Sequence, residues 1–128
     1  MAPNKKVPVP VLKLIASKLK LLAQENRLRL LNELRSGEKT VTELIAATGG
    51  TQANISKHLG VMRGSNIVKC RREGLNVFYS ISDKSVYKLC DLMCNEFRRE
   101  MENSIASRKS TAAISNPIRS ARSSQPRA

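Results

Sequence analysis

Aromatic residues are scarce in this chain, and their scarcity excludes one class of nucleic-acid-binding protein. The 128 residues contain two Phe, two Tyr and no Trp, so aromatic residues make up 3% of the sequence. Proteins that hold single strands on stacked aromatic side chains need several exposed rings. We therefore do not expect a single-strand-binding protein of that type.

Long apolar runs are missing as well. No stretch approaches the roughly eighteen apolar residues of a membrane-spanning helix, and no apolar block precedes a small-residue cleavage site. The three cysteines are an odd number and form no disulfide framework, which fits a reducing compartment. These absences predict a soluble, cytoplasmic protein.

Residues for catalysis are equally sparse. A thiol enzyme needs a base beside its nucleophile, and the single histidine, His58, lies far along the chain from Cys90 and Cys94. No glycine-rich phosphate loop or paired-carboxylate site stands out. The sequence therefore predicts that the protein is not an enzyme.

Acidic residues are few, and this imbalance is informative. The chain has 10 acidic and 23 basic residues, a net charge of +13. Residues 11–103 alone carry 16 basic against 10 acidic side chains. A surplus of this size points to a polyanion, either nucleic acid or an acidic membrane surface.

Apolar periodicity predicts two helices at the start of the chain, at about 11–23 and 26–35, and the second should bury Leu28, Leu31 and Leu34. The first is basic and amphipathic, so it could lie on a membrane. Leu14 and Leu21, however, widen its apolar face, which favours packing against protein on two sides. We therefore expect a subunit contact along this helix.

Two further helices are predicted around a glycine turn. Thr40 and Glu43 form the pattern of a capping box, so a helix should begin at residue 41. Gly49-Gly50 should end it, and Thr51 can cap the next helix. The next helix has a buried stripe, formed by Ile55, Leu59 and Met62.

A β-hairpin should follow, with strands 67–72 and 76–81 after a bend at Ser65-Asn66. The predicted fold is thus mainly α with a small β-hairpin, a winged helix-turn-helix of four helices, two strands and a last helix. We expect a flexible arm at residues 1–10, a DNA-binding and dimerisation domain at 11–103, and a disordered basic tail at 104–128.

The last helix carries an apolar seam that indicates dimerisation. Its members recur at intervals of four, three, four and four residues, as in a coiled coil. They are Val86, Cys90, Met93, Phe97 and Met101. We expect this seam to pair with the first helix and with its own copy in a homodimer.

The polar residues of the helix after the glycine turn, and those of the hairpin tip, are candidates for DNA contact. They could read base edges in the major groove or hold phosphates. The alternative is a solvated helix face and an ordinary polar turn. The candidates are Thr51, Gln52, Asn54, Ser56, Lys57 and His58 in the helix, and Arg71, Arg72 and Asn76 in the hairpin.

Several blocks together resemble the ArsR/SmtB family of bacterial and archaeal repressors. The resemblance covers roughly residues 11–100 and lies in the order of the blocks Leu21–Leu31, Thr42–Leu44, Ser56–Leu59, Ile67-Val68 and Arg71–Tyr79. It implies a homodimeric winged-helix repressor, dimerised by its first and last helices, that leaves its double-stranded operator when an inducer binds.

Two metal sites of that family have no counterpart here. The segment 38–44 carries threonines where the family's metal box has cysteines, and the last helix lacks the histidines of the family's zinc site. Gln24-Glu25 also stands where the family usually has an Asp-Pro or a His-Pro.

Cys90 and Cys94 remain as a candidate ligand pair, one helical turn apart. They could hold a soft metal or metalloid such as arsenite, or react with a redox or sulfur species. They could equally be small apolar side chains of the core, and Cys70 is expected to be structural. For the whole protein, the alternative to a sequence-specific repressor is a non-specific nucleoid-type or RNA-binding protein without an inducer.

Overall fold

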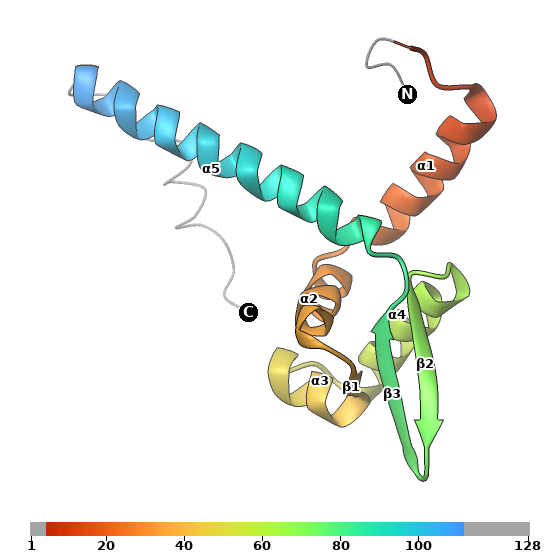
Figure 1. Cartoon of the computed structure of the whole chain (residues 1–128). Helices are drawn as coiled ribbons and strands as arrows, with labels where there is room; N and C mark the ends of the chain where they lie inside the picture. The colour runs from red at the N-terminus through yellow and green to blue at the C-terminus, as the bar shows by residue number, and fades with distance from the viewer. Residues whose placement is uncertain (1–4, 112–128) are drawn as a thin grey trace. The chain divides into compact units, whose positions relative to one another are not determined.

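A computed structural model describes residues 5–111, with side chains described as far as residue 108. The order of elements confirms the predicted winged helix-turn-helix (Figure 1). The chain divides into one compact unit that ends at Asp83 and a second that begins at Lys84. The elements are α1 (Val9–Leu22), α2 (Glu25–Glu33), the 3-10 turn η1 (Leu34–Ser36), β1 (Lys39–Thr40), α3 (Val41–Thr48), α4 (Gln52–Gly64), β2 (Val68–Glu73), β3 (Asn76–Ile81) and α5 (Ser85–Thr111).

The turn between α3 and α4 forms as the local sequence predicts. The Thr40 hydroxyl accepts from the Glu43 N–H, and the Glu43 carboxylate accepts from the Thr40 N–H at 3.0 Å, which completes the capping box. Gly49 ends α3 with a left-handed φ of 76°. Thr51 caps α4 by accepting from the Asn54 N–H at 3.2 Å.

The sheet contains a strand that the sequence did not predict. Its order is β1-β3-β2, all antiparallel, and β1 pairs Lys39 with Tyr79 and Thr40 with Phe78. A two-residue strand is too short to display the alternation that identifies strands in a sequence. Because Thr40 also caps α3, this strand joins the hairpin, or wing, to the helix-turn-helix.

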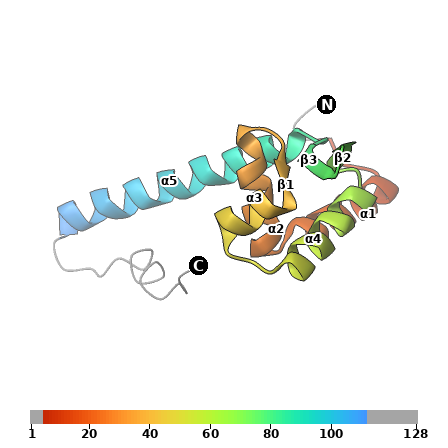
Figure 2. The same ribbon diagram turned by 90° about the horizontal axis from the view of Figure 1, so that it is seen from below.

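The core of the first unit lies where α2, α3 and α4 pack together (Figure 2). Leu44, Leu59 and Met62 are fully buried there. The sequence predicts that Leu28 is buried, and this is wrong: Leu28 is 39% exposed, whereas Leu30 is 2% exposed. α2 therefore buries a different face from the one expected, and this face includes Arg27.

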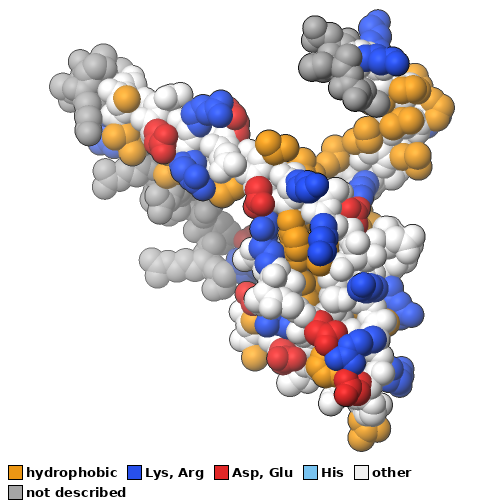
Figure 3. Space-filling view, in the orientation of Figure 1, with side chains coloured by type: hydrophobic (Ala, Val, Ile, Leu, Met, Phe, Trp, Pro, Cys, Tyr) orange, Lys and Arg blue, Asp and Glu red, His pale blue; other side chains and the backbone are white. Residues whose placement is uncertain are grey.

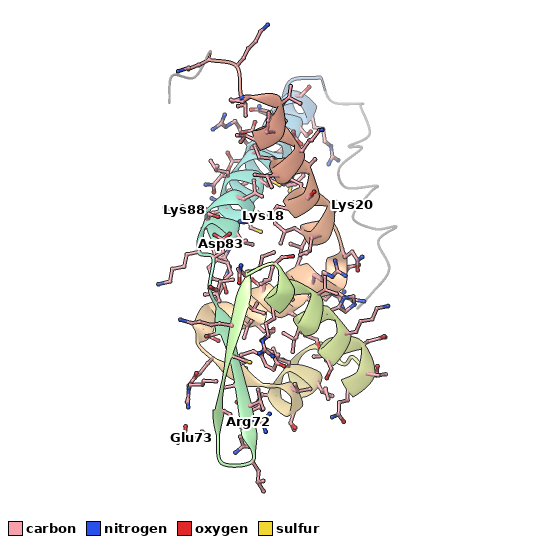
Figure 4. All side chains as sticks on the ribbon, turned by 90° about the vertical axis from the view of Figure 1, so that its right-hand side faces the viewer. Lys18, Lys20, Arg72, Glu73, Asp83 and Lys88 are labelled. Atoms are coloured by element: carbon pink, nitrogen blue, oxygen red, sulfur yellow. The ribbon has the colours of Figure 1, made fainter. Side chains whose placement is uncertain are left out.

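α1 keeps most of its apolar side chains in solvent. It begins at Val9, two residues before the expected start, with Pro10 in its first turn, where proline is well tolerated. Of its residues only Leu22 is buried, and Figure 3 shows hydrophobic side chains gathered over this helix. Lys18 on its polar side forms an ion pair with Asp83 (Figure 4). The exposed apolar residues are Val9, Val11, Leu12, Leu14, Ile15 and Leu19.

α5 is longer than the sequence predicts. The boundary expected at residue 103 is wrong, because the helix continues to Thr111. The prediction followed the loss of large apolar residues, but residues 104–111 contain no Gly or Pro and can therefore remain helical. The rest of the predicted tail, residues 112–128, lies outside the described residues. None of the helices within residues 5–111 is long and apolar enough to cross a membrane.

Candidate DNA-binding interface

The outward face of α4 presents the polar residues that the sequence singled out. Ile55 and Leu59 are buried on the inner face, and they fix the orientation of the helix. The residues predicted to contact DNA point away from this core, with only His58 partly buried. The exposed members are Thr51, Gln52, Asn54, Ser56 and Lys57.

The centre of this outward face carries two small residues, one before and one after Lys57. Ala53 and Gly60 are both exposed, and a Cβ added to Gly60 would meet no atom within 4 Å. Nothing inside the described part of the chain therefore requires glycine at this position. Because a glycine within a helix costs about 1 kcal/mol relative to alanine, its presence favours close approach by something outside the chain.

His58 is tied to a buried arginine that sequence reasoning missed. Arg27 is 8% exposed, and its Nε–H donates to His58 Nδ1 at 3.1 Å. A second guanidinium nitrogen of Arg27 donates to the Leu21 carbonyl at 2.8 Å. One signal in the sequence was available: Arg27 stands three and four residues before Leu30 and Leu31, on the buried face of α2.

This contact determines the protonation of His58. Burial, and then the positive charges of Arg27 and Lys57, lower the pKa of His58 below its ordinary value. Since a guanidinium nitrogen can only donate, Nδ1 carries the lone pair and the single ring proton lies on Nε2. At neutral pH His58 is therefore a neutral side chain that offers one N–H donor.

Arg71 on the wing is already engaged within the chain. Its guanidinium forms ion pairs with Glu38 and with Glu73, the latter at 2.5 Å, and it lies 4.6 Å from the ring centre of Phe78. The hydrogen bond from Arg71 lowers the pKa of Glu38, and the two carboxylates raise the pKa of Arg71. Glu38 lies 33 residues away in the chain, so sequence spacing gave no signal of this cluster.

The other predicted wing residues are exposed. Arg72 faces Val77 across the hairpin, and Asn76 faces Glu73 beside the turn. Figure 4 labels Arg72 and Glu73 near the tip of the hairpin. Alternation along β2 sends Arg72 to the face opposite Arg71. Leu75 at the tip is fully exposed. Arg72 and Asn76 therefore keep the accessibility that a contact with DNA requires.

The candidate ligand pair lies on α5. Cys94 is exposed and Cys90 is partly buried, while Cys70 lies in β2 opposite Tyr79. Within the described residues no three His, Cys, Asp or Glu side chains cluster as a metal site would require. One copy of α5 therefore offers a soft ion two thiolates, which is fewer than a complete ligand set.

Comparison with known proteins identifies the family. The model of the bacterial regulatory proteins of the arsR family matches residues 24–69. The biofilm growth-associated repressor of Agrobacterium fabrum is 34% identical over 101 residues, which span 76% of this chain and 86% of that protein. The chain belongs to the ArsR family.

Other ArsR-family relatives match over a shorter part of their length. The regulator NmtR of Mycobacterium tuberculosis is 39% identical over 77 residues, or 60% of this chain. The SmtB homologue of Synechocystis, a transcriptional repressor, is 40% identical over 68 residues, or 53% of this chain. This chain spans only 64% of the length of the first and 52% of the second.

Solved structures of the ArsR type share the fold. The homodimeric winged helix-turn-helix domain of Mb0332 from Mycobacterium bovis has a TM-score of 0.66 at 29% identity and covers 80% of this chain and 95% of that one. The AntR antimony-specific transcriptional repressor has a TM-score of 0.70 at 28% identity, covering 80% and 93%.

The ArsR model covers only part of the candidate residues. Residues 24–69 include α2, α3, α4 and the start of β2. The match therefore contains Arg27, His58 and the outward face of α4. The hairpin candidates Arg71, Arg72 and Asn76 and the pair Cys90 and Cys94 lie beyond it, so the family model says nothing of their roles.

Proposed function

We propose that this chain is a cytoplasmic homodimeric repressor that binds a specific double-stranded operator. The observation that carries the proposal is the outward face of α4, with small residues at its centre, polar side chains on both flanks and a hydrophobic core behind it. The net charge of +13 supplies the attraction to DNA.

α4 is the recognition helix in this proposal. The major groove admits one α-helix, and Ala53 and Gly60 let the backbone of α4 approach its floor. Gln52 and Ser56, one turn apart on one flank, then reach base edges, while Lys57 points between the flanks toward the DNA. Glutamine makes bidentate contacts with adenine, so Gln52 is the candidate for direct base reading.

The wing supplies contacts beside the groove. Arg72 and Asn76 are exposed on the hairpin and can bind the flanking backbone or the minor groove. Arg71 has a different part, because Glu38 and Glu73 already neutralise it. We assign Arg71 to holding the wing in place. It can contact a phosphate directly only if one of its two ion pairs breaks.

The dimer forms through α1 and α5 in this proposal. Leu14 on α1 is 72% exposed, and Met93 and Phe97 on α5 are 52% and 57% exposed. Exposed apolar side chains gathered along a helix, as on each of these two, mark subunit interfaces. The homodimeric Mb0332 domain supports a homodimer here. A two-fold dimer then presents two recognition helices to two half-sites about 34–36 Å apart.

Cys90 and Cys94 are the proposed inducer site. They offer two thiolates on α5, and the same pair on the other subunit would complete the set for a soft ion. AntR, described as specific for antimony, supports a metalloid of this group. Drawing the thiolates together would change the dimer seam and hence the spacing of the recognition helices, with a typical coupling of about 1–3 kcal/mol.

A salt titration tests the DNA-binding proposal. A duplex recovered by in vitro selection with the wild-type protein is compared with a scrambled duplex of the same length and composition. A specific repressor binds the selected duplex at least about 10³-fold more tightly at physiological salt. Equal affinity for both, with a steep salt dependence, would instead identify a non-specific nucleoid-type protein.

The inducer site is tested separately on the selected duplex. Arsenite, cadmium and a persulfide donor are added in turn to wild type, to the Cys90→Ser/Cys94→Ser variant and to Cys70→Ser as control. We expect release of wild type and of Cys70→Ser, and no release of the double variant. Release of all three proteins, or of none, would assign the α5 cysteines to packing.

A further inference from the structure

A small hollow opens between α2, the end of α3 and α4, beside the proposed recognition helix. Its floor is apolar, formed by Leu30 and Ile55. Its walls are polar and come from three segments that are distant in the sequence. The polar lining residues are Asn26, Arg29, Thr48, Asn54 and His58.

The walls are rich in hydrogen-bond donors. Asn26 and Asn54 each have an amide NH₂ group. Arg29 contributes a guanidinium, one terminal nitrogen of which lies 2.8 Å from a carboxylate oxygen of Glu25. His58 adds a donor, because Arg27 occupies its Nδ1 and leaves the proton on Nε2. None of these polar lining residues carries a negative charge.

From this arrangement we propose that the hollow is a phosphate-binding site. The anionic oxygens of a phosphate accept hydrogen bonds and donate none, so a wall of amides, one imidazole N–H and one guanidinium matches them. Asn54 lies in the first turn of α4, where the helix dipole also favours an anion. The buried Arg27 is a positioning residue, since it fixes the tautomer of His58 without lining the hollow itself.

The source of the phosphate that the geometry favours is the DNA backbone. Asn54 and His58 lie one turn apart on the flank of α4 that faces α2, opposite the flank with Gln52 and Ser56. A helix in the major groove is bordered by backbone on its flanks, and phosphate contacts there fix the register of the protein. This step rests on the proposed function, whereas binding of a free phosphate ion does not.

The first experiment measures DNA affinity with two charge-matched variants of α2. Asn26→Asp places a carboxylate in the hollow, and Asn32→Asp places one on the same helix outside it. We expect Asn26→Asp to lose about ten- to a hundredfold in affinity, equally on the selected and the scrambled duplex, because a phosphate carries no base identity. Asn32→Asp should change the affinity little.

A second variant, which adds no negative charge to the hollow, tests whether the effect of Asn26→Asp comes from a folding defect. Arg29→Gln should weaken both duplexes and lower the slope of log affinity against log salt by about one, whereas Arg98→Gln on α5 should leave the slope unchanged. Thermal melts establish that each variant is folded before its affinity is compared.

The second experiment uses inorganic phosphate alone, at constant ionic strength. Titration is followed by the ¹⁵N and ¹H signals of the His58 ring and of the Asn54 side-chain amide, which all variants keep. Saturable shifts in wild type that Asn26→Asp lacks, together with unchanged DNA binding by that variant, would assign the site to a free anion. If wild type binds no duplex, the proposed function fails. The phosphate titration then still shows whether the hollow binds an anion. If neither DNA affinity nor these signals distinguish Asn26→Asp from Asn32→Asp, the phosphate site is wrong.

Discussion

The reading head, defined as residues 25–81, buries a core of apolar side chains. The two long helices α1 and α5 instead leave most of their apolar side chains exposed. In the head, Leu44, Leu59 and Met62 are 0% exposed. On α1, Leu14 is 72% exposed, and on α5, Leu92 is 68% exposed. The head completes its core within one chain, whereas the two helices keep apolar surface that only a further surface can remove from water.

This contrast predicts that substitutions have different consequences in the two regions. In the head, loss of apolar volume leaves a cavity and lowers the free energy of unfolding. On the exposed faces of α1 and α5, a polar substitution leaves the folded chain intact and weakens only its assembly.

The largest effect is expected in the core of the head. Leu59→Ala removes a fully buried side chain and should lower the free energy of unfolding by about 2–5 kcal/mol. Val61→Ala, on the same helix at 38% exposure, should lower it by less than about 1 kcal/mol. Urea unfolding followed by circular dichroism measures both. Equal losses would mean that α4 does not anchor the core of the head.

The next effect concerns assembly. Met93→Glu/Phe97→Glu places two carboxylates on the apolar face of α5 and should give folded monomers. Their affinity for the selected duplex should fall by about 10²–10⁴, because the two heads no longer bind as one unit. Asn95→Glu/Asn103→Glu carries the same added charge on exposed polar positions and should remain dimeric. Sedimentation at micromolar concentration measures the oligomeric state of all three proteins. A monomeric wild type would contradict the dimer proposal.

A smaller effect distinguishes base reading from phosphate binding within the head. Gln52→Ala should lose about 1–3 kcal/mol on the selected duplex and little on the scrambled one. Lys57→Gln should weaken binding to both by similar factors, since its charge acts on the backbone. Equilibrium titrations of both variants on both duplexes provide the comparison. Parallel losses for Gln52→Ala would remove its base-reading role.

The smallest effect lies at the start of α3. Thr40→Ala removes the capping hydroxyl and should destabilise the head by about 1 kcal/mol, whereas the exposed Thr42→Ala should have almost no effect. Hydrogen bonds from Thr40 lower the pKa of Glu43. The stabilisation by Glu43 is therefore present above its ordinary pKa and is lost as the pH falls through the lowered value. The difference between wild type and Thr40→Ala should accordingly narrow in acid, which pH-dependent melts can measure.

The parts of the fold that the sequence predicted depend on local chemistry. The Thr40–Glu43 capping box, the Gly49 turn and the left-handed Asn66, with φ of 59°, each involve residues within a few positions of one another. Such signals can be read without knowledge of the tertiary structure. The sequence underestimates the length of α5, because residues 104–111 lack large apolar side chains over most of their length and yet remain helical.

The parts that were missed depend on contacts across the chain. Arg27 reaches His58, 31 residues away, and Arg71 reaches Glu38, 33 residues away. No spacing rule links such pairs, since they meet only after the helices and the wing have packed. The hollow beside α4 belongs to the same class, because three separate segments line it.

The cluster of Glu38, Arg71 and Glu73 has a kinetic consequence for a DNA-binding protein. Two carboxylates share one guanidinium, so the cluster brings one net negative charge to the wing. In the proposed repressor, this charge weakens the attraction of the wing to every phosphate, whatever the sequence, and would shorten the time the protein spends on each wrong site. A chain with a net charge of +13 would otherwise be held on random DNA. In the proposed repressor, the acidic pair on the wing would therefore favour a faster search for the operator over tighter binding to random DNA.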